Sequence, residues 1–139
     1  MFKKVLLAAD GSQHSIRAAE KAIAVVKANS NSMIDVFYVI DGATSKTDVL
    51  SHADKYTIAV ERKAKLQPIE EMLEKEGVTH KFHFIHGEPG PAIIKYANEH
   101  KFDLVVIGSR GLNTLQEMVL GSVSHKVAKR VNCAVMIVK

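Results

Sequence analysis

Three glycines and a serine in the last third of the chain have a spacing that suits phosphate binding. Gly108 and Gly111 follow a short apolar run, and nine residues separate them from Gly121-Ser122, where a helix is expected to begin. Glycine lets the main chain turn tightly and approach a ligand closely. A helix start carries unpaired N–H groups and the positive end of the helix dipole, which favour an anion. The pattern therefore indicates a phosphate site, although each glycine alone also suits a turn or a helix cap.

Short apolar runs alternate along the chain with segments of helical period, and this alternation predicts the elements that position the glycines. Strands are expected at 5–9, 33–40, 79–85, 103–107 and 134–138. Helices are expected to begin at Ser12, to span about 51–76, to begin near Pro91 and to begin at Ser122. The result is a single α/β domain over residues 1–139, with a parallel sheet covered on both faces by helices.

Three local features add to this plan. Residues 41–51 are small and polar without a period, which indicates a loop. Pro68 lies inside the second expected helix and should kink it, because proline removes a helical hydrogen bond at a cost of about 3 kcal/mol. His80, His83 and His86 alternate in direction along a strand, so we expect a polar sheet edge there rather than a shared metal ion.

Composition places the chain among soluble globular proteins. Its 139 residues are 47% hydrophobic and 24% charged, with a net charge of +4. No apolar run approaches the roughly 18 residues of a membrane span, and the N-terminal run is too short for a signal peptide. The lysines are spread without interleaved aromatic residues, so nucleic acid is not an expected partner. The single Cys133 cannot form an internal disulfide, which favours the cytoplasm, and we expect its side chain to be buried.

The glycine pattern is neither a Walker A loop nor a dinucleotide-binding Gly-x-Gly-x-x-Gly. It matches without a gap the nucleotide motif of the universal stress protein family, in its ATP-binding branch. The flanking segments Asp103–Gly111 and Leu120–Ser124 also resemble the strand and helix start of that family, and the resemblance covers essentially the whole chain. It implies a doubly wound fold with strand order 3-2-1-4-5. The order reverses between the first and fourth strands, where open parallel sheets bind ligands.

The resemblance implies ATP as the ligand, together with Mg²⁺ or Mn²⁺. The triphosphate would lie on the glycine motif, the backbone of Val39 would contact adenine, and Ala9 would line the same pocket. Asp10 would hold a ribose hydroxyl or the divalent cation, or would only cap the first helix. The expected nucleotide-binding residues are Ala9, Asp10, Val39, Gly108, Ser109, Arg110, Gly111, Gly121, Ser122, Val123 and Ser124.

Four functions compete for this fold, and an ATP-binding stress-response or signalling module is the first. The second is a slow ATP hydrolase or another adenine-nucleotide-cleaving enzyme of the same architecture. Related enzymes carry a Ser-Gly-Gly-type loop or a His-x-Gly-His signature that is missing here, and only Glu117 and His125 could act near the last phosphate. We therefore assign no catalytic residue. A phosphorylated receiver domain would need an acidic pair where the chain has a lone Asp10, and the intact glycine motif argues against a stress protein that has lost nucleotide binding.

The last expected strand, 134–138, predicts self-association. It is apolar on both faces and is expected at an edge of the sheet, where pairing with a second copy would cover it. The family resemblance also implies a homodimer. We therefore expect a homodimer through this strand, while the sequence names no other protein partner.

Overall fold

The computed structural model describes residues 2–40, 55–110 and 121–139, without the side chains of 55–62. Within these ranges five strands alternate with four helices: β1 (Lys4–Ala8), α1 (Gln13–Lys27), β2 (Met33–Ile40), α3 (Lys55–Lys75), β3 (Thr79–His86), α4 (Pro89–Glu99), β4 (Leu104–Gly108), α5 (Ser122–Arg130) and β5 (Ala134–Val138). Each strand lies within one residue of its predicted range. The predicted loop at 41–51, Gly111 and Glu117 fall outside the described residues.

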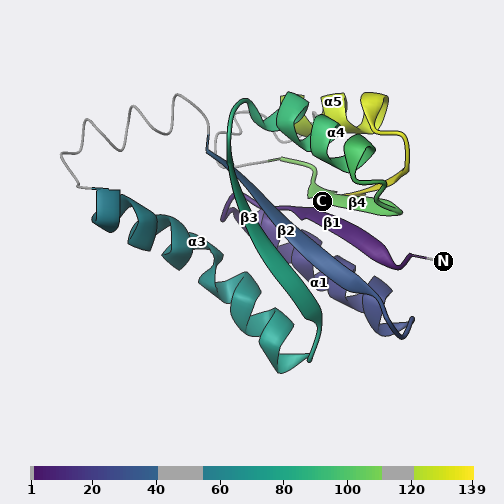
Figure 1. Cartoon of the computed structure of the whole chain (residues 1–139), viewed down its shortest axis with the longest axis horizontal. Coiled ribbons are helices and arrows are strands. Elements are labelled where there is room, and N and C mark those ends of the chain that lie inside the picture. The colour runs from purple at the N-terminus through teal and green to yellow at the C-terminus, as the bar shows by residue number, and fades with distance from the viewer. Residues whose placement is uncertain (1, 41–54, 111–120) are drawn as a thin grey trace.

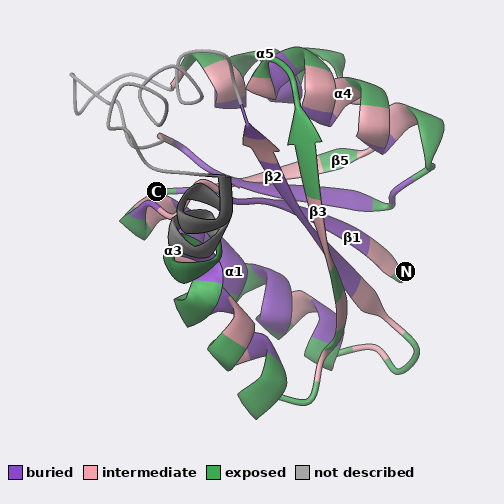
Figure 2. Ribbon diagram, turned by 60° about the vertical axis from the view of Figure 1, so that its left-hand side comes forward, coloured by how far each residue is buried: buried purple, intermediate pink, exposed green. Residues whose placement is uncertain are grey.

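The strands form one parallel sheet in the order β3-β2-β1-β4-β5 (Figure 1). Helices α1 and α3 cover one face of the sheet, and α4 and α5 cover the other (Figure 2). The predicted doubly wound α/β fold is therefore confirmed, including its strand order. From β1 the chain adds β2 and β3 on one side, and from β4 it adds β5 on the other, so the predicted reversal lies between the neighbouring strands β1 and β4.

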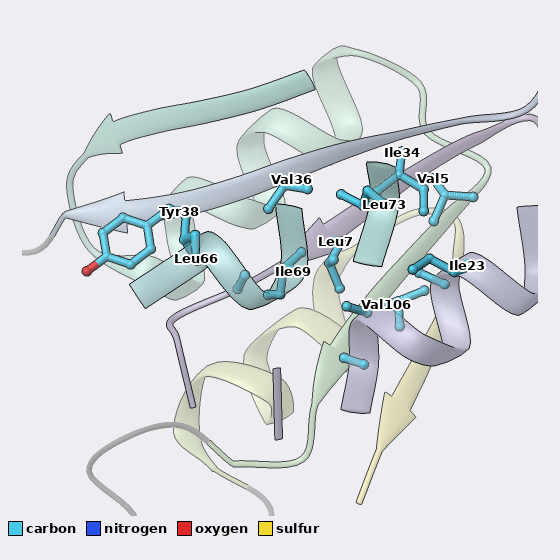
Figure 3. Packing of buried hydrophobic residues seen from close by; sticks show 14 of the residues in the cluster. Val5, Leu7, Ile23, Ile34, Val36, Tyr38, Leu66, Ile69, Leu73 and Val106 are labelled. Carbon is cyan, nitrogen blue, oxygen red and sulfur yellow. The ribbon is translucent and has the colours of Figure 1, made fainter. Parts of the chain in front are cut away.

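The core consists of two apolar layers that share the sheet. On the side of α1 and α3, Val5 and Leu7 of β1 pack with Ile69 and Leu73 of α3, and all four side chains are fully buried (Figure 3). Leu6 points to the other layer, as the alternation of a strand requires. Burying a large aliphatic side chain contributes about 1.5–3 kcal/mol, so these layers fix how the strand ends lie relative to the helix starts.

Helix α3 continues from Lys55 to Lys75 with Pro68 inside it. Leu66 and Ile69 on either side of the proline are buried against the sheet, so packing retains the helix across the missing hydrogen bond. Among the described residues, no helix is both long enough and apolar enough to cross a bilayer.

The predicted burial of Cys133 was wrong. Cys133 is only half-buried, because it lies just before the edge strand β5, whose outer side has no described neighbour. Val123 and Val131 are also half-buried, whereas Val127 is fully buried. The nine-residue α5 thus buries Val127 against the sheet, whereas Val123 in its first turn and Val131 just after it are only partly covered.

Candidate functional site

The carboxyl ends of β1 and β4 bring three of the predicted segments together. These strands are paired up to Ala8 and Ile107, so the segments that leave them begin side by side. The start of α5 is joined to the same place, because the N–H of Gly121 donates to the carbonyl oxygen of Ser109 at 2.8 Å. Residues that are far apart in the sequence therefore meet at the carboxyl ends of β1 and β4, where the order of strands reverses.

Gly108 is required by the approach of α1 to β4. A Cβ atom built on Gly108 would lie 2.7 Å from Cβ of His14 and 2.9 Å from its carbonyl carbon. Both distances are shorter than van der Waals contact, so a side chain here would push the helix away. The close approach that the sequence predicted for Gly108 is thus made to a helix of the same chain.

Among the described residues, no side chain caps the first turn of α5. Its N-cap is Gly121, with φ −61° and ψ 153°, and the N–H groups that follow have no side-chain acceptor within residues 2–40, 55–110 and 121–139. Those of Ser122, Val123 and Ser124 occupy the first three helical positions, where the helix itself supplies no acceptor. They point out of the N-terminal end of the helix, where the helix dipole is positive.

Two expected phosphate contacts are used inside the protein instead. The N–H of Gly121 already donates to the carbonyl oxygen of Ser109. The hydroxyl of Ser124 is buried and donates to the carbonyl oxygens of Ser109 and Gly121, each at 3.0 Å. This N–H and this hydroxyl therefore hold the start of α5 to the end of β4.

Asp10 orders the turn between β1 and α1. Its Oδ1 accepts from the N–H of Ser12 at 2.9 Å, in a turn that Gly11 enters with φ 84°. The cap of α1 is Ser12, whose hydroxyl oxygen accepts from the N–H of Ser15 at 3.1 Å. The alternative in which Asp10 caps the first helix is therefore wrong, although the carboxylate does support the turn before that helix.

The main-chain groups of Val39 face the β1 side of β2, beyond the last residue pair of these two strands. Along a parallel strand, successive residues direct their N–H and C=O to opposite neighbours. The carbonyl of Phe37 faces β1, where it accepts from the N–H of Ala9 at 3.1 Å, and the carbonyl of Ile40 faces β3, where it accepts from Gly87. Val39 therefore faces the same side as Phe37 but lies two residues beyond the last pair with β1. Its N–H and C=O border the space above Ala9.

A group of basic side chains lies on the α1 side of these strand ends. Nε of Arg110 is buried, and no group among the described residues accepts a hydrogen bond from it. Nδ1 of His14 lies 3.0 Å from the guanidinium of Arg17. Burial lowers the pKa of His14 below its usual 6.5, and the positive charges of Arg17 and Arg110 lower it further, whereas Asp10 acts in the opposite direction.

Sequence reasoning did not find His14 or Arg17. Both are polar residues in the first two turns of a helix, where such side chains usually face solvent. The one available signal was their spacing of three residues, which places them on the same side of the helix close to Asp10. That signal is common in helices and carries little information about function.

The three histidines of β3 have separate roles. Nε2 of His83 lies 2.9 Å from Oδ2 of the buried Asp35, Nδ1 of His80 lies 2.7 Å from the carbonyl oxygen of Val78, and His86 is exposed. The described part of the chain contains no group of three or more His, Cys, Asp or Glu residues placed to hold a metal ion. The polar side chains of β3 lie on the first strand of the sheet, at the edge that was predicted.

Comparison with known proteins agrees with this architecture. The model of the universal stress protein family matches residues 1–139. The universal stress protein YxiE of Bacillus subtilis is 32% identical, with both chains covered fully. The solved structure of MJ0577 from Methanocaldococcus jannaschii is 29% identical and has a TM-score of 0.83, with 100% of this chain and 96% of that chain covered. A universal stress protein solved in complex with cAMP is 28% identical and has a TM-score of 0.71, with coverages of 99% and 96%. The chain belongs to the universal stress protein family.

Proposed function

We propose that this protein binds ATP and acts as a small dimeric stress-response or signalling module in the cytoplasm. The observation that carries the proposal is the uncapped start of α5, which presents the N–H groups of Ser122, Val123 and Ser124 beside the ends of β1 and β4. The buried Nε of Arg110, which has no acceptor among the described residues, supports an anionic ligand at the same place. A relative of similar fold binds cAMP, an adenine nucleotide.

In this proposal the phosphates lie on the start of α5. The three unpaired N–H groups would donate to phosphate oxygens, and the guanidinium of Arg110 would balance part of the negative charge. Gly108 and Ser109 would form the floor of the site, and Gly111, which lies outside the described residues, would belong to the same loop.

The nucleoside would extend from there towards the end of β2. Adenine would contact the exposed N–H and C=O of Val39, above Ala9. Asp10 would contact a ribose hydroxyl or, together with phosphate oxygens, hold Mg²⁺ or Mn²⁺, since carboxylate and phosphate oxygens are the ligands that these ions prefer. We assign no catalytic residue, and we expect hydrolysis far below the median of about 10 per second for enzymes.

The homodimer would form through β5. Among the described residues this strand pairs only with β4, and its side chains Val135, Met136 and Ile137 are half-exposed although they are apolar. Addition of β5 from a second copy would satisfy the open edge and cover these side chains. Sedimentation at micromolar concentration should give the mass of a dimer, and the mass of a monomer would contradict this part of the proposal.

Calorimetry with Mg-ATP on the parent and two variants of Gly121 tests the nucleotide site. Gly121→Ala and Gly121→Asp both add a Cβ, which would lie 3.3 Å from the carbonyl oxygen of Ser109, and the φ of −61° suits either residue. Only aspartate adds a carboxylate, which would accept from the N–H groups of α5 and repel phosphate.

We expect Gly121→Asp to weaken ATP binding by at least about a hundredfold, which corresponds to about 2.7 kcal/mol. Gly121→Ala should stay within a few-fold of the parent, and both variants should keep the circular dichroism spectrum of the parent. Unchanged affinity in Gly121→Asp would place the phosphates elsewhere. Mass spectrometry of nucleotide carried through purification would identify the natural ligand.

A further inference from the structure

The end of β5 is attached to the candidate phosphate loop, residues 108–110, by two routes. The direct route is a hydrogen bond of 2.7 Å from the N–H of Ser109 to the carbonyl oxygen of Val138. The second route passes through Arg17, whose Nε donates to the main-chain oxygen of Lys139 at 2.8 Å. The other arm of the same guanidinium reaches Nδ1 of His14 at 3.0 Å.

The contact between Arg17 and His14 has a defined polarity. A guanidinium has only donors, so Nδ1 of His14 must accept and the neutral ring must carry its proton on Nε2. Burial and the nearby charges of Arg17 and Arg110 lower the pKa of His14, so the ring is neutral at neutral pH. Arg17 therefore fixes both the tautomer and the orientation of this imidazole.

The backbone of His14 packs closely against Gly108 in the loop. Its Cβ and carbonyl carbon lie within 2.9 Å of the position that a Cβ of Gly108 would take. Little free space separates the backbone of His14 from Gly108, so a shift of the first turn of α1 would be transmitted to Gly108 and to the Arg110 that follows. The guanidinium of Arg17 thus contacts the residue after β5 and the ring of His14, whose backbone packs on Gly108, with two arms that a single point charge could not reproduce.

We propose that Arg17 is a positioning residue that holds the phosphate loop 108–110 in its binding conformation by joining the end of β5 to His14. The inference rests on the proposed function, because the loop is assigned to phosphate there. The competing explanation is that Arg17 only adds positive charge near a negative ligand. The two explanations differ for Arg17→Lys, which keeps the charge and loses the two-armed geometry.

The experiment compares the parent with Arg17→Lys and with the control Arg130→Lys, the same exchange at an exposed residue in the last turn of α5. In the protein without ligand, the amide NMR signals of Gly108 and Ser109 should move in Arg17→Lys and stay in place in Arg130→Lys. In calorimetry with Mg-ATP, Arg17→Lys should bind about tenfold more weakly, and Arg130→Lys should bind like the parent.

Unmoved amide signals in Arg17→Lys, or parental ATP affinity in that variant, would overturn the positioning role. If the parent itself does not bind ATP, the proposed function fails. The amide signals of the ligand-free proteins then still decide whether Arg17 orders the loop.

Discussion

Helices α1 and α5 begin at the same end of the sheet, and their first turns differ in chemistry. Ser12 closes the start of α1 by accepting from the N–H of Ser15, and Asp10 accepts from the N–H of Ser12 itself. At the start of α5 the cap is Gly121, which has no side chain, and the hydroxyl of Ser124 donates to carbonyl oxygens. One helix start is closed by its own side chains, while the other has no side-chain cap among the described residues.

Helix α4 also begins at this end of the sheet, and it shows why an uncapped start alone does not suffice. Its N-cap Glu88 makes no capping hydrogen bond, yet Pro89 and Pro91 occupy the first and third helical positions. Proline has no N–H, so only Gly90 could donate there. Of the starts of α1, α4 and α5, only that of α5 has three consecutive N–H groups without a side-chain cap or a proline among the described residues, which is why we propose it for the phosphates.

The comparison of the two helix starts depends first on the close packing of α1 on β4. Gly108→Ala, which disturbs this packing, should have the largest effect on stability. The new Cβ would overlap His14, so we expect a loss of about 1–3 kcal/mol in the free energy of unfolding, measured by urea titration. Gly90→Ala is a matched control, because its Cβ would meet the flexible side chain of Lys126. Equal stability of the two variants would contradict the close seating of α1.

The next prediction replaces one serine at each helix start with alanine. Ser12→Ala should cost about 1 kcal/mol of stability, because it removes the cap of α1, and should leave nucleotide affinity largely unchanged. Ser122→Ala should change stability by less than about 0.5 kcal/mol, because its side chain is exposed. Calorimetry should show weaker ATP binding in Ser122→Ala only if its hydroxyl adds a donor. Strong destabilisation by Ser122→Ala would show that α5 is capped after all.

The smallest expected effect concerns pH. The folded pKa of His14 lies below 6.5, so the unfolded chain takes up a proton first as pH falls. His14 should therefore reduce stability progressively as pH drops from 6.5 through its lower folded pKa, and this reduction should be small for a half-buried ring. Urea titrations between pH 5 and 8 should show a flatter profile for His14→Gln than for the parent. Parallel profiles would contradict the lowered pKa.

The helices and strands could be predicted from the sequence because local residue patterns determine them. Buried parallel strands are continuous apolar runs, and the runs at β1 and β4 are each bounded by the polar or glycine residues that end them. The strand order came with the family resemblance. The position of the site followed from the order, since the reversal at β1 and β4 fixes which loops meet.

The chemistry of the site could be predicted only in part. A glycine in the sequence indicates that another group approaches the main chain closely, but it does not show which group that is. Gly108 was expected beside a ligand, and the neighbour is His14. Gly121 and Ser124 were expected at the phosphate site, and in the structure the N–H of Gly121 and the hydroxyl of Ser124 donate to main-chain oxygens of Ser109 or Gly121. Arg17 donates to the main-chain oxygen of Lys139, 122 positions away, a separation that no local pattern encodes.

An NMR titration of the amide groups with Mg-ATP tests the central comparison most directly. If α5 is the open helix start, the N–H signals of Ser122, Val123 and Ser124 should show the largest shifts, and those of Gln13 and Ser15 at the closed start of α1 should change much less. Saturating shifts confined to the first turn of α1, or the absence of saturable shifts at the start of α5, would contradict the account.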